Sequence, residues 1–227
     1  MDRRALLTAV SLTAAGFFVP GSAASAVLPA AAVAPRARWL TAALKAEGVK
    51  TVGVGDWSHH NRDHKGPWGP LTGVVIHHTA STAEKASIEL CRKGRSDLPG
   101  PLCHGVIAKS GTVYLVGYGR ANHAGLGDSA VLDAVRAGRK LPRPRRWNAD
   151  GNRFFYGFEC INAGNGRDPW PDAQLEAIVR ASAALCRHHG WESNRVISHA
   201  EWQKGKIDPK GFSMNTLRTR IAKRLSP

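Results

Sequence analysis

The sequence predicts an α/β fold, a single domain in which a central mixed β-sheet is flanked by helices. Short apolar runs rich in β-branched residues alternate along the chain with longer amphipathic segments, as strands alternate with helices. The chain has 227 residues, of which 43% are hydrophobic, enough for one sizeable core. No internal repeat divides it. Strands interleaved with helices indicate a sheet packed against helices.

The first half of the predicted domain contains two helices, one buried strand and a hairpin. A continuous β-branched run predicts a strand at 73–78. The residues Ser81-Thr82-Ala83-Glu84 match a capping box that begins a helix ending near Gly94. The turn Lys109-Ser110-Gly111 predicts the hairpin. The remaining expected segments are a helix at 39–47, a surface loop at 53–70, and hairpin strands at 103–108 and 112–116.

The second half of the predicted domain alternates in the same way. Pro171 fits the first turn of a long helix that Gly190 would close, with one apolar stripe between them. The basic run 139–146 contains two prolines and is expected to be an inserted, mobile loop. The other expected elements are strands at 154–161 and 195–198 and an amphipathic helix at 215–224.

The amino-terminal residues predict export. Arg3 and Arg4 precede the 15-residue apolar segment 5–19, and small residues at 24–26 offer a cleavage site. Both the twin-arginine and the general secretory route fit this pattern, so we expect the mature protein to be secreted or held in the cell envelope. An uncleaved anchor is the alternative, but the apolar segment is short for a membrane span. The expected divisions are a signal peptide at 1–26, an Ala/Pro-rich linker at 27–38 and the globular domain at 39–227.

The net charge of the chain indicates which class of partner it binds. Lys and Arg number 32 against 17 Asp and Glu, a formal net charge of +15. Such a surplus favours a polyanionic partner. Nucleic acid is one such partner, but the sequence lacks RGG, zinc-finger and RNA-binding aromatic motifs, so no specific nucleic-acid binding is expected. A bacterial wall that carries phosphate-rich polymers is the other.

The cysteines leave two alternatives open. Export would permit disulfide bonds, and four cysteines allow three connectivities, among which their spacing does not choose. Buried free thiols are an equal alternative. The four are Cys91, Cys103, Cys160 and Cys186.

Two regions far apart in the sequence carry groups that suit a metal. His77 and His78 end an apolar strand, and because side chains alternate faces along a strand, the two histidines point in opposite directions. His199 follows another short strand, and Asp208 lies nine residues further on. A hydrolytic zinc site takes three nitrogen or carboxylate ligands and leaves one position for water. His77, His199 and Asp208 would supply such a set, with Lys206 facing the same cavity from an extended loop.

Other histidines fit plainer roles. His188 and His189 end a predicted helix, where a cationic imidazole suits the helix dipole. The segment 59–64 is rich in His, Asn and Asp but lies in a loop without strand support. Together with the charge, it motivates the alternative of an exported nuclease or nucleic-acid-binding protein. That alternative needs basic clusters beside the loop, and the densest basic run, 139–146, lies elsewhere.

Three ordered motifs create a family resemblance. They are Val75-Ile76-His77-His78-Thr79-Ala80, Tyr156-Gly157-Phe158-Glu159, and His199-Ala200-Glu201-Trp202 through Lys206-Ile207-Asp208-Pro209. Together they resemble the type 2 N-acetylmuramoyl-L-alanine amidases, a superfamily that includes phage T7 lysozyme, AmpD-type amidases and the peptidoglycan recognition proteins. The resemblance extends over about 73–220 and is nearest to amidases of actinobacteria and their phages. Three motifs in order are far more specific than any one.

The resemblance implies a T7-lysozyme-like amidase fold and a zinc enzyme. The implied substrate is peptidoglycan, its glycan strand and stem peptide, cleaved between N-acetylmuramic acid and L-alanine. By the same resemblance, His77, His199 and Asp208 are the Zn²⁺ ligands. Glu159 handles the catalytic water, and Lys206 stabilises the oxyanion.

The resemblance also implies substrate contacts and shows one departure. His123, His78 and Asn122 are implied to bind substrate. Phage relatives often have Tyr before the His of the hairpin strand, whereas here Cys103 precedes His104. The catalytic pair would therefore work without a tyrosine.

A non-catalytic peptidoglycan-recognition module is the alternative within the same fold. Recognition members of the superfamily lose a metal ligand, so the third-ligand position discriminates. Asp208 is competent to bind zinc, which favours hydrolysis. We expect a monomer without stable membrane insertion after cleavage, attached to anionic wall polymers by its charge.

Overall fold

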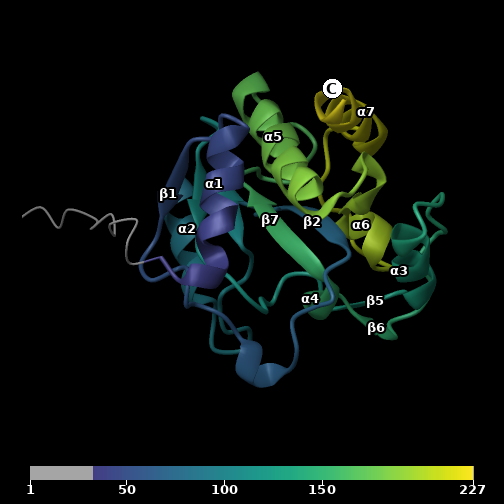
Figure 1. The fold of residues 1–227 in the computed structure, drawn as a ribbon, viewed down its shortest axis with the longest axis horizontal. Coiled ribbons are helices and arrows are strands. Elements are labelled where there is room, and N and C mark those ends of the chain that lie inside the picture. Colours follow the sequence, from purple (N-terminus) through teal and green to yellow (C-terminus); the bar gives the residue numbers. More distant parts are fainter. Residues whose placement is uncertain (1–32, 227) are drawn as a thin grey trace, which may run out of the picture.

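The computed structural model describes residues 33–226, and Figure 1 shows how they are arranged around one sheet. The sheet has six strands in the order β1-β4-β3-β7-β2-β8. Their bounds are β1 (Thr51–Gly53), β2 (Gly73–His78), β3 (Gly105–Ile107), β4 (Val113–Leu115), β7 (Phe155–Cys160) and β8 (Val196–Ser198). A separate ribbon pairs β5 (Leu126–Gly127) with β6 (Ala149–Asp150).

The strand pairing makes this sheet mixed. β3 and β4 run antiparallel, as the predicted hairpin. The pairs β1–β4, β3–β7, β7–β2 and β2–β8 are all parallel. The predicted α/β fold, with a central mixed sheet flanked by helices, is confirmed. Because parallel strands end at the same edge, residues that follow β2 and β8 meet there.

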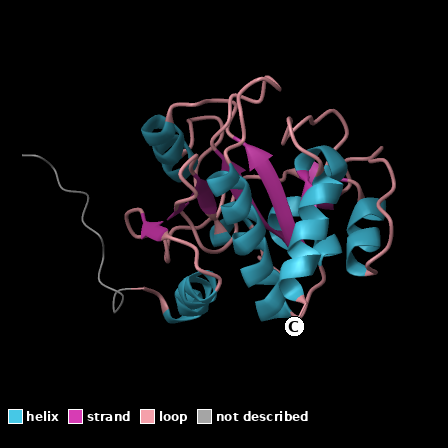
Figure 2. Ribbon diagram, turned by 90° about the horizontal axis from the view of Figure 1, so that it is seen from above, coloured by secondary structure: helices cyan, strands magenta, loops and turns pink. Residues whose placement is uncertain are grey.

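Helices lie on either side of the central strands, as Figure 2 shows. Those of more than one turn are α1 (Arg38–Ala46), α2 (Glu84–Lys93), α3 (Ser129–Arg136), α5 (Asp172–His189) and α7 (Met214–Leu225). Shorter turns are η2 (Pro35–Ala37), η3 (Asp63–Lys65), α4 (Gly151–Phe154), η4 (Ser193–Arg195) and α6 (His199–Trp202). No helix within 33–226 is long and apolar enough to cross a lipid bilayer.

Side-chain alternation along β2 decides which residues reach the site. Val74 and Ile76 enter the core beneath α1 and α5, whereas Val75 packs on the opposite face with α3 and α6. His77 therefore points to the face of Val75, and His78 to the face of Ile76. Their contacts agree, since His77 meets groups on α6 while His78 meets the backbone after Asp208. The expected opposite orientation of the two histidines is confirmed.

The globular fold begins before Trp39, earlier than predicted. Residues 35–38, expected to belong to the linker at 27–38, form η2 and the start of α1. Ala34 and Ala37 are buried, and the Ala34 N–H donates to the Ser58 hydroxyl at 3.0 Å. Their small side chains let the segment pack closely against the core. The predicted signal peptide and residues 27–32 of the predicted linker lie outside the described residues.

The predicted capping box at Ser81 is wrong. The N-cap of α2 is Ala83, without a side-chain cap, and the Ser81 hydroxyl accepts the Ala83 N–H instead. A backbone bridge to Asn162, beyond β7, holds Ser81 away from the helix start. A capping box does form at α6, where Ser198 and Glu201 each accept the other's backbone N–H.

Candidate metal centre and active site

Three side chains from distant segments converge at one edge of the sheet. The Nδ1 atoms of His77 and His199 are 3.0 Å apart, and Asp208 Oδ2 is 3.0 Å from each of them. Both histidines are buried, and Asp208 is largely so. Within the described part of the chain, this is the only group of three or more such donors close enough to hold one metal ion. The structure thus brings the three predicted ligands together.

The turn that begins α6 holds His199. The capping box at Ser198 starts this turn directly after β8, so that His199 is its first residue. Arg218 of α7 binds the carboxylate oxygens of Glu201 at 2.9 and 3.1 Å and so ties the turn to the last helix. Asp208 lies beside His199 because the main-chain carbonyl of Asp208 accepts the Ala200 N–H at 2.9 Å.

The electrostatics of the three groups suit a cation. Burial, helped by the neighbouring His199, lowers the pKa of His77 to about 4, so the imidazole is neutral at pH 7. Burial alone would raise the pKa of Asp208, but hydrogen bonds with His199 and His77 outweigh burial and hold it well below its ordinary value. A neutral imidazole and an ionised carboxylate are the forms in which these groups bind metals.

The donor set fits zinc. Imidazole nitrogen and carboxylate oxygen are ordinary zinc ligands. Tetrahedral ligands at about 2.0–2.1 Å from zinc stand about 3.3 Å from one another, close to the 3.0 Å triangle of His77, His199 and Asp208. Three ligands on one triangle leave a fourth position open, as in hydrolytic rather than structural zinc sites.

Glu159 lies one strand away from His77. The two residues are partners in the parallel register of β2 and β7, so their side chains share one face of the sheet. Glu159 Oε2 is buried and has no hydrogen-bond partner among the described residues. Burial raises the pKa of Glu159 well above its ordinary value, and the neighbouring Cys91 adds to the effect. A desolvated carboxyl beside such a site is suited to proton transfer.

Lys206 lies on the exposed side of the site. It belongs to the loop 203–208, which follows α6, and its neighbour Ile207 is 64% exposed. The Lys206 charge lowers the pKa of both His77 and Glu159, so its ammonium group acts on both. We call His77 with Glu159 the buried wall of the site, and the loop 203–208 the exposed wall.

A family match extends over the three metal-ligand candidates and over Glu159 and Lys206. Residues 67–211, more than half of the chain, match the family described as N-acetylmuramoyl-L-alanine amidase. The chain belongs to this family. Membership supports an amidase function on peptidoglycan, and the resemblance to the type 2 superfamily is confirmed. The expected nearness to actinobacterial members stays a prediction.

Solved amidase structures share the fold. The endolysin N-acetylmuramoyl-L-alanine amidase LysCS from Clostridium intestinale URNW has a TM-score of 0.51 and 16% identity, over 76% of this chain and 95% of that one. The amidase AmiD from E. coli, solved with the substrate anhydro-N-acetylmuramic acid-L-Ala-D-gamma-Glu-L-Lys, has a TM-score of 0.50 and 17% identity, over 69% of this chain and 59% of that one. At these identities the likeness establishes the fold. No curated protein sequence matches the chain significantly.

In this member of the amidase family, His78 lies outside the metal triangle. Its Nδ1 accepts the Lys210 N–H at 3.2 Å, and its ring packs against Gly164. A Cβ at Gly164 would overlap the ring, and the backbone there has a φ of +67°, so glycine is needed on both counts. His78 therefore connects the loop 162–170 to the backbone that follows Asp208.

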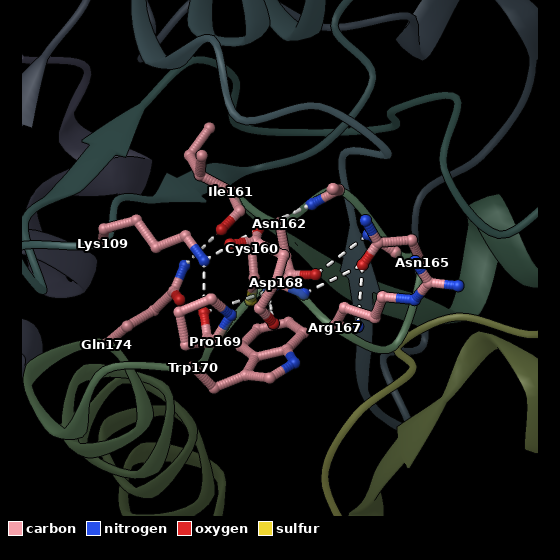
Figure 3. Close-up of polar contacts among 12 residues, drawn as sticks. Lys109, Cys160, Ile161, Asn162, Asn165, Arg167, Asp168, Pro169, Trp170 and Gln174 are labelled. Carbon is pink, nitrogen blue, oxygen red and sulfur yellow. Dashed lines mark hydrogen bonds and ion pairs between the residues drawn. The ribbon is translucent and has the colours of Figure 1, made fainter.

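The loop 162–170 is held by a polar network, drawn in Figure 3. Asp168 accepts the N–H of residue 163 at 2.8 Å and pairs with Lys109 at 2.9 Å. Asn165 Oδ1 accepts the N–H groups of Arg167 and Asp168 at 2.8 and 2.9 Å. These bonds close the loop on itself and fix the backbone beside His78.

His123 is placed differently from the substrate contact that the resemblance implied. Its ring is 8% exposed, with Nδ1 3.1 Å from His77 Nε2 and Nε2 3.1 Å from the Phe155 main-chain oxygen. Burial lowers the pKa of His123 well below its ordinary value. Asn122, beside it, donates its side-chain amide to the Pro99 oxygen at 2.7 Å. His123 therefore lies behind the metal triangle, with both ring nitrogens engaged inside the protein.

The cysteine at the position of the relatives' tyrosine is fully buried. Burial raises the pKa of Cys103 well above its ordinary value, so the thiol stays protonated. The adjacent His104 is bound to main chain on both sides, accepting the Gly157 N–H and donating to the Gly119 oxygen. All four cysteines are buried free thiols, the second of the two alternatives.

The His-rich segment 59–64 has structural contacts. Asp63 accepts the Arg120 N–H at 2.7 Å and pairs with Arg36 at 2.9 Å, which ties this loop to the start of the fold. His60 Nδ1 lies 2.8 Å from the Val116 oxygen. The polar side chains of the segment 59–64 thus connect this loop to distant parts of the chain.

Proposed function

We propose that the chain is a zinc-dependent hydrolase that cleaves the amide bond between N-acetylmuramic acid and L-alanine in peptidoglycan. One observation carries this proposal: the ligand triangle of His77, His199 and Asp208 stands beside a carboxylate, Glu159, whose Oε2 has no internal partner. Three ligands, an open position and an adjacent proton acceptor are the parts of a hydrolytic zinc site. Family membership supports the bond that is cleaved.

The proton chemistry belongs to Glu159. Bound zinc would supply a water whose pKa is lowered to about 7 and a Lewis acid for the scissile carbonyl. Glu159 Oε2 would take the proton of the attacking water and pass it to the L-alanine nitrogen as that nitrogen leaves. Because this oxygen makes no hydrogen bond inside the protein, its proton affinity is available for the reaction.

Negative charge that develops on the carbonyl oxygen would be stabilised by Lys206. Its ammonium group acts on both His77 and Glu159, so it lies within Coulomb range of the reacting atoms. The buried, protonated thiol of Cys103 would not take over the catalytic part of the tyrosine that phage relatives often have at this position. Glu159 and Lys206 would therefore carry the chemistry between them.

We also propose that the mature enzyme is an exported monomer that adsorbs to anionic wall polymers. The net charge of +15 and the amino-terminal residues support this. The backbone N–H groups of Arg145 and Arg146 donate to buried Asp128 at 2.7 and 3.0 Å, which anchors one end of the basic run 139–146. The run presents exposed side chains of Arg139, Lys140 and Arg143.

Substitution of the basic run tests the adsorption. Replacing Arg139, Lys140 and Arg143 together by Gln should weaken binding to purified walls and flatten its salt dependence, because exposed charges are screened. Hydrolysis of soluble wall fragments should be unchanged. Pull-down of walls across a salt series measures this, and adsorption of the variant equal to that of the unaltered chain at every salt concentration would contradict it.

The products of wall digestion test the reaction. Peptidoglycan treated with the zinc-loaded chain should release peptides with new amino-terminal L-alanine and no new reducing sugar ends, as read by mass spectrometry. If new amino-terminal L-alanine never appears at any zinc concentration, the amidase proposal fails. Retained binding to peptidoglycan would then favour the recognition module.

A further inference from the structure

The His77 nitrogen that points away from the metal site has a partner of its own. His77 Nε2 lies 3.1 Å from His123 Nδ1, and His123 Nε2 lies 3.1 Å from the Phe155 main-chain oxygen. The two rings are 1% and 8% exposed and stand edge to face, with centroids 5.3 Å apart. These contacts form one chain from the metal side of His77 to the first residue of β7.

The carbonyl at the end of this chain sets the direction of every proton in it. A main-chain oxygen accepts and never donates, so His123 Nε2 carries the hydrogen. A buried imidazole without a carboxylate partner is neutral, which leaves a lone pair on His123 Nδ1. His77 Nε2 must then donate to it. With its hydrogen on Nε2, His77 can present the lone pair of Nδ1 to a metal bound beside Asp208 Oδ2 and His199 Nδ1, each 3.0 Å from that atom.

We propose that His123 is a positioning residue of the metal centre, which fixes His77 in the Nε2–H form and holds its Nδ1 lone pair toward the ligand triangle. The proposal rests on the zinc site of the proposed function and adds a residue that would contact neither the metal nor the substrate. A hydrogen bond at the far nitrogen of a ligand histidine sets the ring's orientation and raises its basicity. Loss of such a bond typically lowers metal affinity about 10-fold to 100-fold.

Two neighbours hold His123 itself. Asn152 Oδ1, from α4, accepts the N–H groups of residues 123, 124 and 125 at 2.9, 2.9 and 3.1 Å, which fixes the backbone that carries the ring. Gly157 of β7 lies against the ring, and a Cβ there would overlap it at Nδ1. A glycine within a strand often marks such a close approach. Gly157 in β7 therefore leaves the space that the His123 ring occupies.

The second ligand histidine has a different support. His199 Nε2 lies 2.9 Å from Gln203 Oε1, in the exposed wall. An amide side chain can turn to present either its oxygen or its nitrogen, whereas a main-chain carbonyl has one role. We therefore expect zinc affinity to depend more on His123 than on Gln203.

Zinc affinity of His123 variants tests the proposal. The dissociation constant is measured by competition with a chromophoric chelator, together with the melting temperature of the metal-free protein. His123→Leu should weaken zinc binding about 10-fold to 100-fold. His123→Asn should recover part of that loss, because its Oδ1 can accept from His77 Nε2.

A matched control separates positioning from packing. His104 is as buried as His123, lies 5.6 Å from it ring to ring, and bonds only to main chain. His104→Asn should lower the melting temperature and leave the zinc affinity of the folded protein unchanged. Gly157→Ala should push the His123 ring aside and weaken zinc binding, but have little further effect in a His123→Ala background, which has room for the methyl group.

Imidazole tautomers provide a readout that does not depend on the variants. Long-range ¹H–¹⁵N spectra of the zinc-loaded protein should show Nε2–H for both His77 and His123. His123 protonated at Nδ1, or a folded His123→Leu that binds zinc as tightly as the unaltered chain, overturns this proposal alone. Failure of the unaltered chain to bind zinc overturns the proposed function together with it.

Discussion

The buried wall and the exposed wall of the site are held by different kinds of structure. His77 and Glu159 stand on neighbouring parallel strands, in register, with His123 packed behind. The loop 203–208 is joined to the fold by few bonds, and Ile207 in it is 64% exposed. His77 and Glu159, which must keep a fixed geometry, lie on strands, and Lys206, which would meet the substrate's changing charge, lies on the loop. His77, together with Asp208 at the end of the loop, should therefore govern metal binding, and Lys206 only turnover.

Removal of a ligand from the buried wall should have the largest effect. His77→Ala should abolish zinc binding and with it hydrolysis, because two ligands do not make a hydrolytic zinc site. His78→Ala is the matched control, one residue along on the opposite face of β2, and should keep its zinc. Metal analysis after dialysis measures both. Full zinc content in His77→Ala would show that the triangle is not the metal site.

Glu159→Gln should separate binding from turnover within the buried wall. Zinc affinity should be kept, while kcat falls about 10²-fold to 10⁴-fold, the usual contribution of a general base. The metal-free variant should also be more stable at pH 7, since a neutral amide avoids the cost of ionising a buried carboxyl. Kinetics on soluble wall fragments and thermal melts measure the two effects. A variant with the full rate would remove Glu159 from the mechanism.

Lys206→Met should show a smaller effect confined to turnover. A loss in kcat of about 10-fold to 100-fold is expected, less than for a buried oxyanion donor because this ammonium group is exposed. Lys204→Met is the control, since Lys204 lies in the same loop but over the Trp147 ring at 5.3 Å. If both variants lose the same activity, the effect is one of general charge and not of position.

Acid should weaken the metal-free fold through its buried histidines. Burial lowers the pKa of both His77 and His104 from 6.5 to about 4. Between these values the unfolded chain binds protons that the folded chain does not, so stability is fully present above pH 6.5 and falls as pH drops toward 4. Each shift corresponds to about 3 kcal/mol at most. Denaturant midpoints between pH 4 and 7 measure this, and a flat profile would contradict it.

Strong local periodicity made much of the fold predictable. The β-branched run of β2 and the long stripe of α5, closed by Gly190 in a left-handed conformation, were both expected at nearly their observed bounds. The local sequence pattern did not predict the structure correctly where pairing with a distant segment determines it. Ser81 and Ser198 both precede a Glu by three residues, but only Ser198 caps a helix, because a bridge to Asn162 occupies the Ser81 backbone.

The ligand set was predictable from residue type and order, but its supports were not. Nothing local to His123 shows that it stands behind His77, because that contact depends on the pairing of β2 with β7 and on the space that Gly157 leaves. The burial of Ala34 was likewise not predicted, because this residue lies in the Ala/Pro-rich segment that was assigned to the linker. Asn152, whose side chain holds the backbone of residues 123–125, lies 29 residues further along the chain than His123, so sequence spacing alone does not link the two.

The most direct test of the account is the rate of amino-terminal L-alanine release from peptidoglycan in three states of one preparation. These are the zinc-loaded chain, the same chain after chelation, and the chelated chain with zinc restored. We predict that hydrolysis is lost on chelation and returns with one zinc per chain. Hydrolysis that continues at full rate in the metal-free chain would contradict the account.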